Sequence, residues 1–268
     1  MTSWWGAVRR WRERRVLDRR SIPDTLWTCT ETRFPFLRQP NPAQTTRLRE
    51  MSSLFLEAKQ FSGAHGLQVT DDMAVAVAAQ ACLPILHLGL GWYDGFVGIV
   101  VHEGELATRR ERIDDVGIVH EFEDVFSGEA MAGGPVTLSW QDVLMAGPGE
   151  AVTDPEAWAY GVVIHEMAHV LDMRDGELDG MPPLPSRARQ FRWQSALDEA
   201  HDELSRQLDG GRPTVIDPYA LEAPEEFFAV ACEAFFITPQ RLRQAHGSLY
   251  AELREFFQQD PALHAGAD

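Results

Sequence analysis

The chain has 268 residues, 44% of them hydrophobic, and a formal net charge of −17 at pH 7. This length fits one large domain or two modest ones, and this apolar fraction is ordinary for a globular protein with a core. A chain this acidic is a poor match for nucleic acid, and no apolar run approaches the roughly 18 residues of a membrane span. We therefore expect neither direct nucleic-acid binding nor a membrane span.

The first twenty residues differ in charge from the rest of the chain. They hold seven arginines against Glu13 and Asp18, a local excess of +5, which leaves −22 for the remainder of the −17 total. Tryptophans and other apolar residues lie between these arginines and predict a basic helix. We expect it to dock on the acidic body by its tryptophans, with the arginines reaching into solvent. A membrane-surface or partner-binding helix is the alternative.

The three cysteines, Cys29, Cys82 and Cys232, are far apart and form no C-x-x-C pair. An odd and sparse count indicates reduced thiols rather than a disulfide scaffold. The N-terminal stretch also lacks the continuous apolar segment of a secretory signal. The expected location is therefore the cytoplasm.

Residues 21–268 are predicted to form one domain, with a helical part over residues 21–90 and a catalytic part over residues 91–260. Apolar residues at helical spacing predict a helix over residues 43–62, ended by Gly63 to Gly66. A second helix is expected from Met73 to about Leu86, capped by the preceding Thr70-Asp71-Asp72 stretch. Both helices are interpreted as core elements rather than as carriers of chemistry.

The middle of the chain predicts a small sheet, antiparallel or mixed, and therefore a mainly helical α+β fold. The expected strands are Phe96–Val101, Asp114–Val119 and Pro135–Trp140. His102-Glu103 and His120-Glu121 lie near strand ends. We interpret these pairs as ordinary polar residues, because no third metal ligand is in register with either of them. Further helices are expected over residues 191–208, 223–236 and 239–257, with residues 213–221 extended.

The strongest chemical signal is the H-E-x-x-H motif within Val162–Asp172. His165 and His169 are four residues apart and therefore share one face of a helix. Two imidazoles on one face can bind one zinc ion at about 2.0–2.1 Å. Glu166 can reach a zinc-bound water without being a ligand, which is the geometry of a general base in metal-assisted peptide hydrolysis.

The context of the motif supports a buried helix. The stretch Asp154-Pro155-Glu156 offers an N-cap, a proline at the first helical position and an acid in the first turn. Apolar residues surround the histidines, which would need polar partners inside a core. The alternative interpretation is two hydrogen-bonded core histidines beside a surface glutamate.

A catalytic zinc needs a third protein ligand, and Glu225 and Glu226 compete for that role. Glu226 and Glu233 are seven residues apart and share a helix face, so that Glu226 could bind the ion while Glu233 accepts a hydrogen bond from a ligand histidine. Glu225 lies on another face and is better suited to the helix N-terminus. The alternative is that both acids are solvated residues of a first helical turn.

Several stretches together resemble the Mlc titration factor A family of cytoplasmic bacterial zinc peptidases. They keep their order along the chain, and they are Ile22-Pro23-Asp24, Val75–Pro84, Gly134–Trp140, His165–Asp172 and Glu226–Val230. The last two also resemble the catalytic domain of anthrax lethal factor, a gluzincin. This resemblance implies a zincin-like fold with Glu226 as the third zinc ligand, and it assigns a catalytic role to Tyr219, seven residues upstream. The N-terminal basic helix lies outside the matched stretches.

The family resemblance implies aminopeptidase-like hydrolysis of small peptide substrates, and a three-ligand site implies one zinc per chain. It also implies binding of a transcriptional repressor like Mlc, from which the family takes its name. We expect Val136–Trp140 to be the sheet edge on which a peptide lies. The rival hypothesis is an interaction module that sequesters a transcription factor around a mainly structural zinc. The sequence offers no obvious fourth ligand for such a closed site, since Cys232 is off the face of Glu226.

Overall fold

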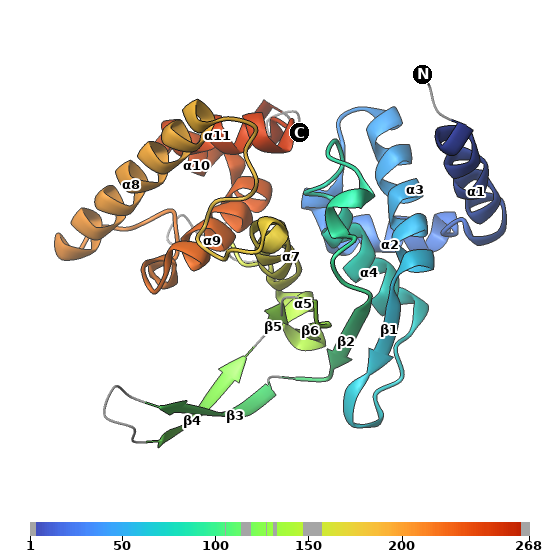
Figure 1. The fold of residues 1–268 in the computed structure, drawn as a ribbon, viewed down its shortest axis with the longest axis horizontal. Coiled ribbons are helices and arrows are strands. Elements are labelled where there is room, and N and C mark those ends of the chain that lie inside the picture. The colour runs from blue at the N-terminus through green and yellow to red at the C-terminus, as the bar shows by residue number, and fades with distance from the viewer. Residues whose placement is uncertain are drawn as a thin grey trace.

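The computed structural model describes residues 4–104, 106–113, 119–126, 128–130, 133–146 and 157–263 (Figure 1). Helices dominate these ranges and a small sheet lies beside them, which confirms the predicted mainly helical α+β fold with a mixed sheet. In the described part of the chain, none of the helices combines the length and apolar character that crossing a membrane requires.

The N-terminal half contributes four helices, α1 (Trp4–Arg20), α2 (Asp24–Arg33), α3 (Pro42–Ala58) and α4 (Asp71–Cys82). Helix α1 packs along α3, and Arg20 forms an ion pair with Glu57 at 3.0 Å. The expected docking through tryptophans is wrong for Trp11, which is 56% exposed and has Arg15 over its ring. For Trp4 and Trp5 the structure describes the backbone alone.

The predicted helix over residues 43–62 ends earlier than its apolar pattern suggested. Asn41 caps α3 by accepting a hydrogen bond from the backbone of Ala43, and the helix stops at Ala58. Strand β1 (Gln60–Gly63) follows and pairs in parallel with β2 (Gly98–His102). Tertiary pairing with a distant strand therefore overrides a local helical pattern. The next helix, α4, also ends early, before Pro84, as expected for residues that precede proline.

The main sheet has the strand order β1-β2-β6-β5, where β5 is Gly128–Ala130 and β6 is Val136–Ser139. Strands β1, β2 and β6 are parallel, and β5 runs antiparallel to β6. The expectation that Val136–Trp140 forms a sheet edge is therefore wrong, because β2 and β5 flank β6 on its two sides.

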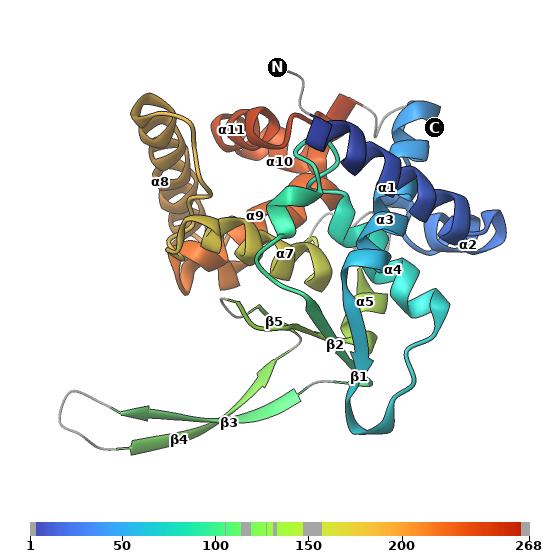
Figure 2. The same cartoon turned by 45° about the vertical axis from the view of Figure 1, so that its right-hand side comes forward.

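A separate antiparallel hairpin, β3 (Leu106–Ile113) with β4 (Val119–Phe126), extends away from the body between β2 and β5 in the chain (Figures 1 and 2). Residues 114–118 of the predicted strand Asp114–Val119 lie outside the described residues, and Val119 begins β4. Strand β3 had no counterpart among the predicted strands.

Two buried helices form the centre of the molecule, α7 (Val162–Asp172) and α9 (Pro224–Ile237). They pack against each other, and α7 also contacts α4 and β5. Nearly every residue of α9 after its first turn is buried, as expected for a helix that is apolar on all sides. A short helix, α5 (Trp140–Met145), links β6 to the segment before α7.

Three further helices cover α9 in Figure 1: α8 (Arg187–Asp209), α10 (Pro239–Ala245) and α11 (Gly247–Phe257). The single helix predicted over residues 239–257 is wrong, because His246 leaves helical geometry with φ −131° and ψ 63° and separates α10 from α11. The extended segment predicted over residues 213–221 ends instead in a 3-10 turn, η5 (Pro218–Leu221).

Candidate metal centre

The H-E-x-x-H helix begins later than its sequence suggested. Residues 157–161 are not helical and Gly161 is the N-cap of α7, so a start near residue 155 is wrong; residues 154–156 themselves lie outside the described ranges. The backbone N–H of Gly161 donates a hydrogen bond to Oε2 of Glu233, which comes from α9. A carboxylate from a distant part of the chain therefore satisfies the backbone N–H group of the N-cap residue of this helix.

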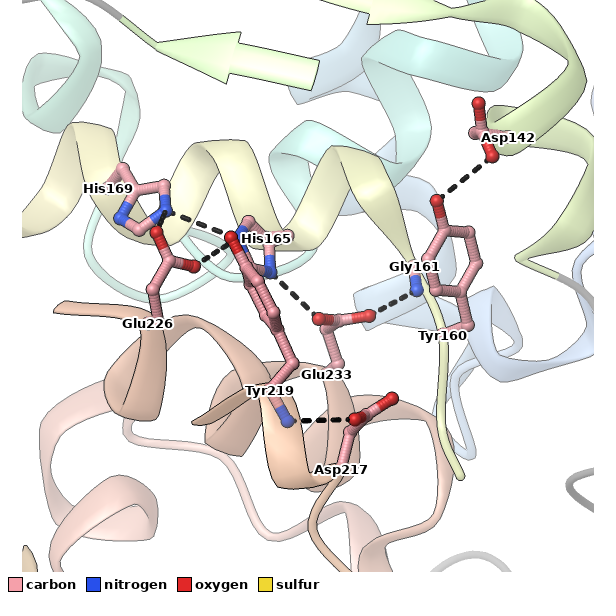
Figure 3. Close-up of polar contacts among 9 residues, drawn as sticks. All are labelled: Asp142, Tyr160, Gly161, His165, His169, Asp217, Tyr219, Glu226 and Glu233. Carbon is pink, nitrogen blue, oxygen red and sulfur yellow. Dashed lines mark hydrogen bonds and ion pairs between the residues drawn. The ribbon is translucent and has the colours of Figure 1, made fainter. Parts of the chain in front are cut away.

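His165, His169 and Glu226 converge as the sequence predicts (Figure 3). The two Nε2 atoms of the histidines lie 3.1 Å apart. Carboxylate oxygens of Glu226 lie 3.0 Å from Nε2 of His165 and 3.6 Å from Nε2 of His169. These three residues offer one ligand atom each, all within 4.8 Å of one another, and no other such group occurs among the side chains that the structure describes.

The donor set fits a divalent metal ion. Two imidazole nitrogens and one carboxylate oxygen are the protein ligands of many catalytic zinc sites, which leave a further position open. Burial works against ionisation of Glu226, but hydrogen bonds from His165 and His169 prevail and hold the pKa of this carboxyl group well below its usual range. Glu226 is therefore anionic, as a metal ligand must be.

Glu233 packs behind the candidate metal site, and the predicted hydrogen bond between it and His165 is present. Its Oε1 accepts from Nδ1 of His165 at 2.9 Å, while Oε2 accepts from Gly161. The bond to Nδ1 turns the Nε2 atom of His165 toward Glu226. One buried carboxylate thus orients a histidine and caps the helix that carries it.

Glu166 lies beside β5, the edge strand next to β6, and is only 4% exposed. Gly128 of β5 packs against it so closely that a Cβ atom at position 128 would lie 2.5 Å from Oε1 of Glu166. The edge strand therefore passes directly along the side of α7 that carries this carboxylate. Nothing in the local sequence around Gly128 indicates this contact, because it joins residues that are 38 positions apart in the chain.

Tyr219 approaches the cluster from η5, and Figure 3 shows its ring pointing toward His165 and Glu226. The side chain of Asp217 accepts a hydrogen bond from the backbone N–H of Tyr219 at 2.9 Å and caps this turn. The ring centroids of Tyr219 and His165 are 6.3 Å apart, and Tyr219 is 51% exposed. It therefore stands at the exposed rim of the cluster.

The other candidates from the sequence are not part of this cluster. Glu225 lies in the first turn of α9, and Cys232 is buried within that helix. His102 is buried, and its Nδ1 contacts the carbonyl oxygen of Gly104. For His120 and Glu121 the structure describes the backbone alone.

Comparison with known proteins extends over nearly the whole chain. The family described as glucose-regulated metallo-peptidase M90 matches residues 8–258. An uncharacterized protein of Synechocystis is 36% identical over 257 residues, which are 95% of this chain and 90% of the relative. Mlc titration factor A of Pectobacterium atrosepticum is 34% identical, and that of Klebsiella pneumoniae is 32% identical, each over 85% of this chain and 84% of the relative.

Proposed function

Because the chain belongs to the glucose-regulated metallo-peptidase family M90, we propose that it is a zincin-like, zinc-dependent peptidase. The observation that carries this proposal is the convergence of His165, His169 and Glu226 on one point. Two imidazoles with one carboxylate suit zinc, whereas magnesium and calcium prefer sites built from oxygen ligands alone. We propose one zinc ion per chain.

The remaining residues have distinct roles in this proposal. Zinc held at the cluster would supply Lewis acidity, which activates water and polarises the scissile carbonyl group. Glu166, next to a ligand but outside the ligand set, accepts a proton from the attacking water and returns it to the leaving amine. The Tyr219 hydroxyl, at the rim, donates a hydrogen bond to the oxyanion of the tetrahedral intermediate.

The sheet edge suggests where the substrate lies. Strand β6 is paired on both sides, but β5 pairs only with β6 in the described part of the sheet. An extended peptide could add to the outer side of β5 through backbone hydrogen bonds. Because Gly128 of β5 packs against Glu166, such a peptide would lie next to the proposed general base. Small peptides cleaved in an aminopeptidase-like manner are the proposed substrates, in line with the family resemblance of the motifs.

A second function is favoured by the names of two relatives, Mlc titration factor A. We propose that this chain also binds a transcriptional repressor similar to Mlc, which would place it in the cytoplasm. In the rival interpretation the protein is only an interaction module and zinc is structural. A structural zinc site has four protein ligands, and the described side chains supply three in this cluster, which favours the enzyme.

Metal analysis combined with hydrolysis tests the proposal. Purified protein should contain zinc and cleave members of a panel of aminoacyl chromogenic substrates. Activity should disappear with a chelator and return when zinc is added back. Zinc-loaded protein that cleaves neither these substrates nor unmodified small peptides would contradict the peptidase proposal and favour the interaction module.

A further inference from the structure

The loop between α7 and α8, residues 176–186, is anchored to the core at Gly180. Residues 174–179 are exposed, whereas Gly180 is buried. Its backbone N–H donates a hydrogen bond to Oδ2 of Asp172 at 2.8 Å. Its carbonyl oxygen accepts one from Nε1 of Trp193 at 3.0 Å. Asp172 ends α7 and Trp193 belongs to α8, and both side chains are buried, so these two bonds fix the position of Gly180.

Gly180 also touches the first residue of α9. A Cβ atom built on Gly180 would lie 2.4 Å from the carbonyl oxygen of Pro224 and 2.8 Å from its carbonyl carbon. Atoms of a folded protein do not approach this closely, so only glycine fits between the loop and the start of α9. The backbone of Gly180 has φ +80°, which also favours glycine.

The two ligand-bearing helices are thereby connected at both of their ends. At one end, Glu233 of α9 binds Gly161 at the start of α7. At the other end, Gly180 joins Asp172 to the start of α9. In this second connection, Asp172 is three residues after His169, and Pro224 is two residues before Glu226. It therefore lies nearer along both helices to the contact between His169 and Glu226 than the connection at the start of α7 does.

We propose that Gly180 is a positioning residue that sets the distance between Glu226 and the two histidines. The inference rests on the proposed metal site. A side chain at position 180 would push the first turn of α9, and Glu226 with it, away from α7. Metal affinity depends strongly on such placement, since changes to groups that orient ligands typically weaken binding by about 10–100-fold.

A matched pair of glycine variants tests this proposal. Gly176 lies in the same loop with φ +98°, and a Cβ atom there would meet nothing within 4 Å. Gly176→Ala therefore carries the same kind of backbone strain as Gly180→Ala without the contact with Pro224. Both metal-free variants are titrated with zinc chloride against a competing chromogenic chelator, and their folding is checked by thermal unfolding. We expect zinc affinity to fall at least about tenfold in Gly180→Ala and to stay near that of the wild type in Gly176→Ala.

Equal zinc affinity in the two glycine variants would overturn the proposal, provided that Glu226→Gln weakens binding. Retention of zinc by Glu226→Gln would instead contradict the metal site itself, so the two failures are distinguishable. Should Gly180→Ala fail to fold, Asp172 offers an independent test. Asp172→Asn keeps an acceptor for the Gly180 N–H and should keep zinc affinity, whereas Asp172→Ala should lower it. Equal affinity of these two folded variants would also overturn the proposal.

Discussion

The α7–α9 pair and the N-terminal helices α1–α4 differ in what their charged groups do. In the N-terminal helices the charged pairs are exposed or half-buried, as in Arg20 with Glu57 and Arg33 with Asp72. In the α7–α9 pair, charged and polar side chains are buried and bind one another, as Glu233 binds His165. Exposed ion pairs contribute only about 0–1 kcal/mol to stability, whereas buried charges are costly unless they are paired.

This difference indicates that the two regions contribute differently to stability and to metal binding. The N-terminal helices supply packing area, and substitutions of their surface charges should change stability little. The α7–α9 pair keeps a costly buried cluster of histidines and carboxylates, which hydrophobic residues of similar size could replace without loss of stability. We propose that this cluster serves metal binding rather than stability. Changes in the two regions should therefore have very different effects on metal binding and hydrolysis.

The largest effect is expected from removing the histidines. His165→Ala and His169→Ala each delete one of the three proposed ligands, so each variant should lose zinc and hydrolytic activity, whereas the wild type should carry about one zinc per chain. Elemental analysis after dialysis measures this directly. Stoichiometric zinc in the double variant would show that the ion is bound elsewhere.

The next effect distinguishes the two neighbouring acids of α9. Glu226→Gln removes the anionic ligand and should weaken zinc binding by more than about 100-fold. Glu225→Gln is the matched control, because the same substitution one residue earlier lies outside the cluster and should leave affinity nearly unchanged. A titration with zinc that gives the reverse order would show that the register of α9 has been assigned wrongly.

A smaller effect is expected at the rim of the cluster. Tyr219→Phe keeps the ring and all three ligands, so zinc should be retained. Because only one donor to the oxyanion is lost, kcat should fall by up to about 10²-fold, with KM changed less. Steady-state kinetics of the zinc-loaded variant measure both constants. An unchanged kcat would exclude a catalytic role for this hydroxyl group.

The smallest effect is expected from the N-terminal helix. We propose that residues 1–20 are appended to a single domain formed by residues 21–268. Helix α1 contacts α3 and supplies no residue to the cluster, so a truncated protein should hydrolyse peptides within a few-fold of the full chain. Circular dichroism confirms whether the truncated protein is folded. Loss of hydrolysis in a folded truncation would show that α1 shapes the active site.

The residues of the candidate metal cluster were predictable because their signals are local. His165 and His169 share a helix face by their spacing alone, and the same argument pairs Glu226 with Glu233. The start of α7 was not predictable in this way. Glu233, 72 residues from Gly161 in the chain, accepts the hydrogen bond of the Gly161 N–H group. The helix therefore needs no Ser, Thr, Asp or Asn at its N-cap. The local stretch Asp154-Pro155-Glu156 therefore gave a misleading start.

The sheet was harder to predict than the helices. Strand β5 has only three residues, Gly128, Glu129 and Ala130, none of which favours a strand by itself. It exists because it pairs with β6, and the same holds for β1 beside β2. Short strands made by distant pairing leave almost no periodic pattern, which is why the edge of the sheet was assigned to β6.

The measurement that tests the central claim most directly is the hydrolysis rate of zinc-loaded Glu166→Gln. Glu166 is not a proposed ligand, so this variant should keep its zinc and its fold. The amide cannot accept a proton from water, and kcat should therefore fall by at least about 10²-fold. Full activity of the zinc-loaded variant would contradict Glu166 as the general base, and with it the proposed peptidase mechanism.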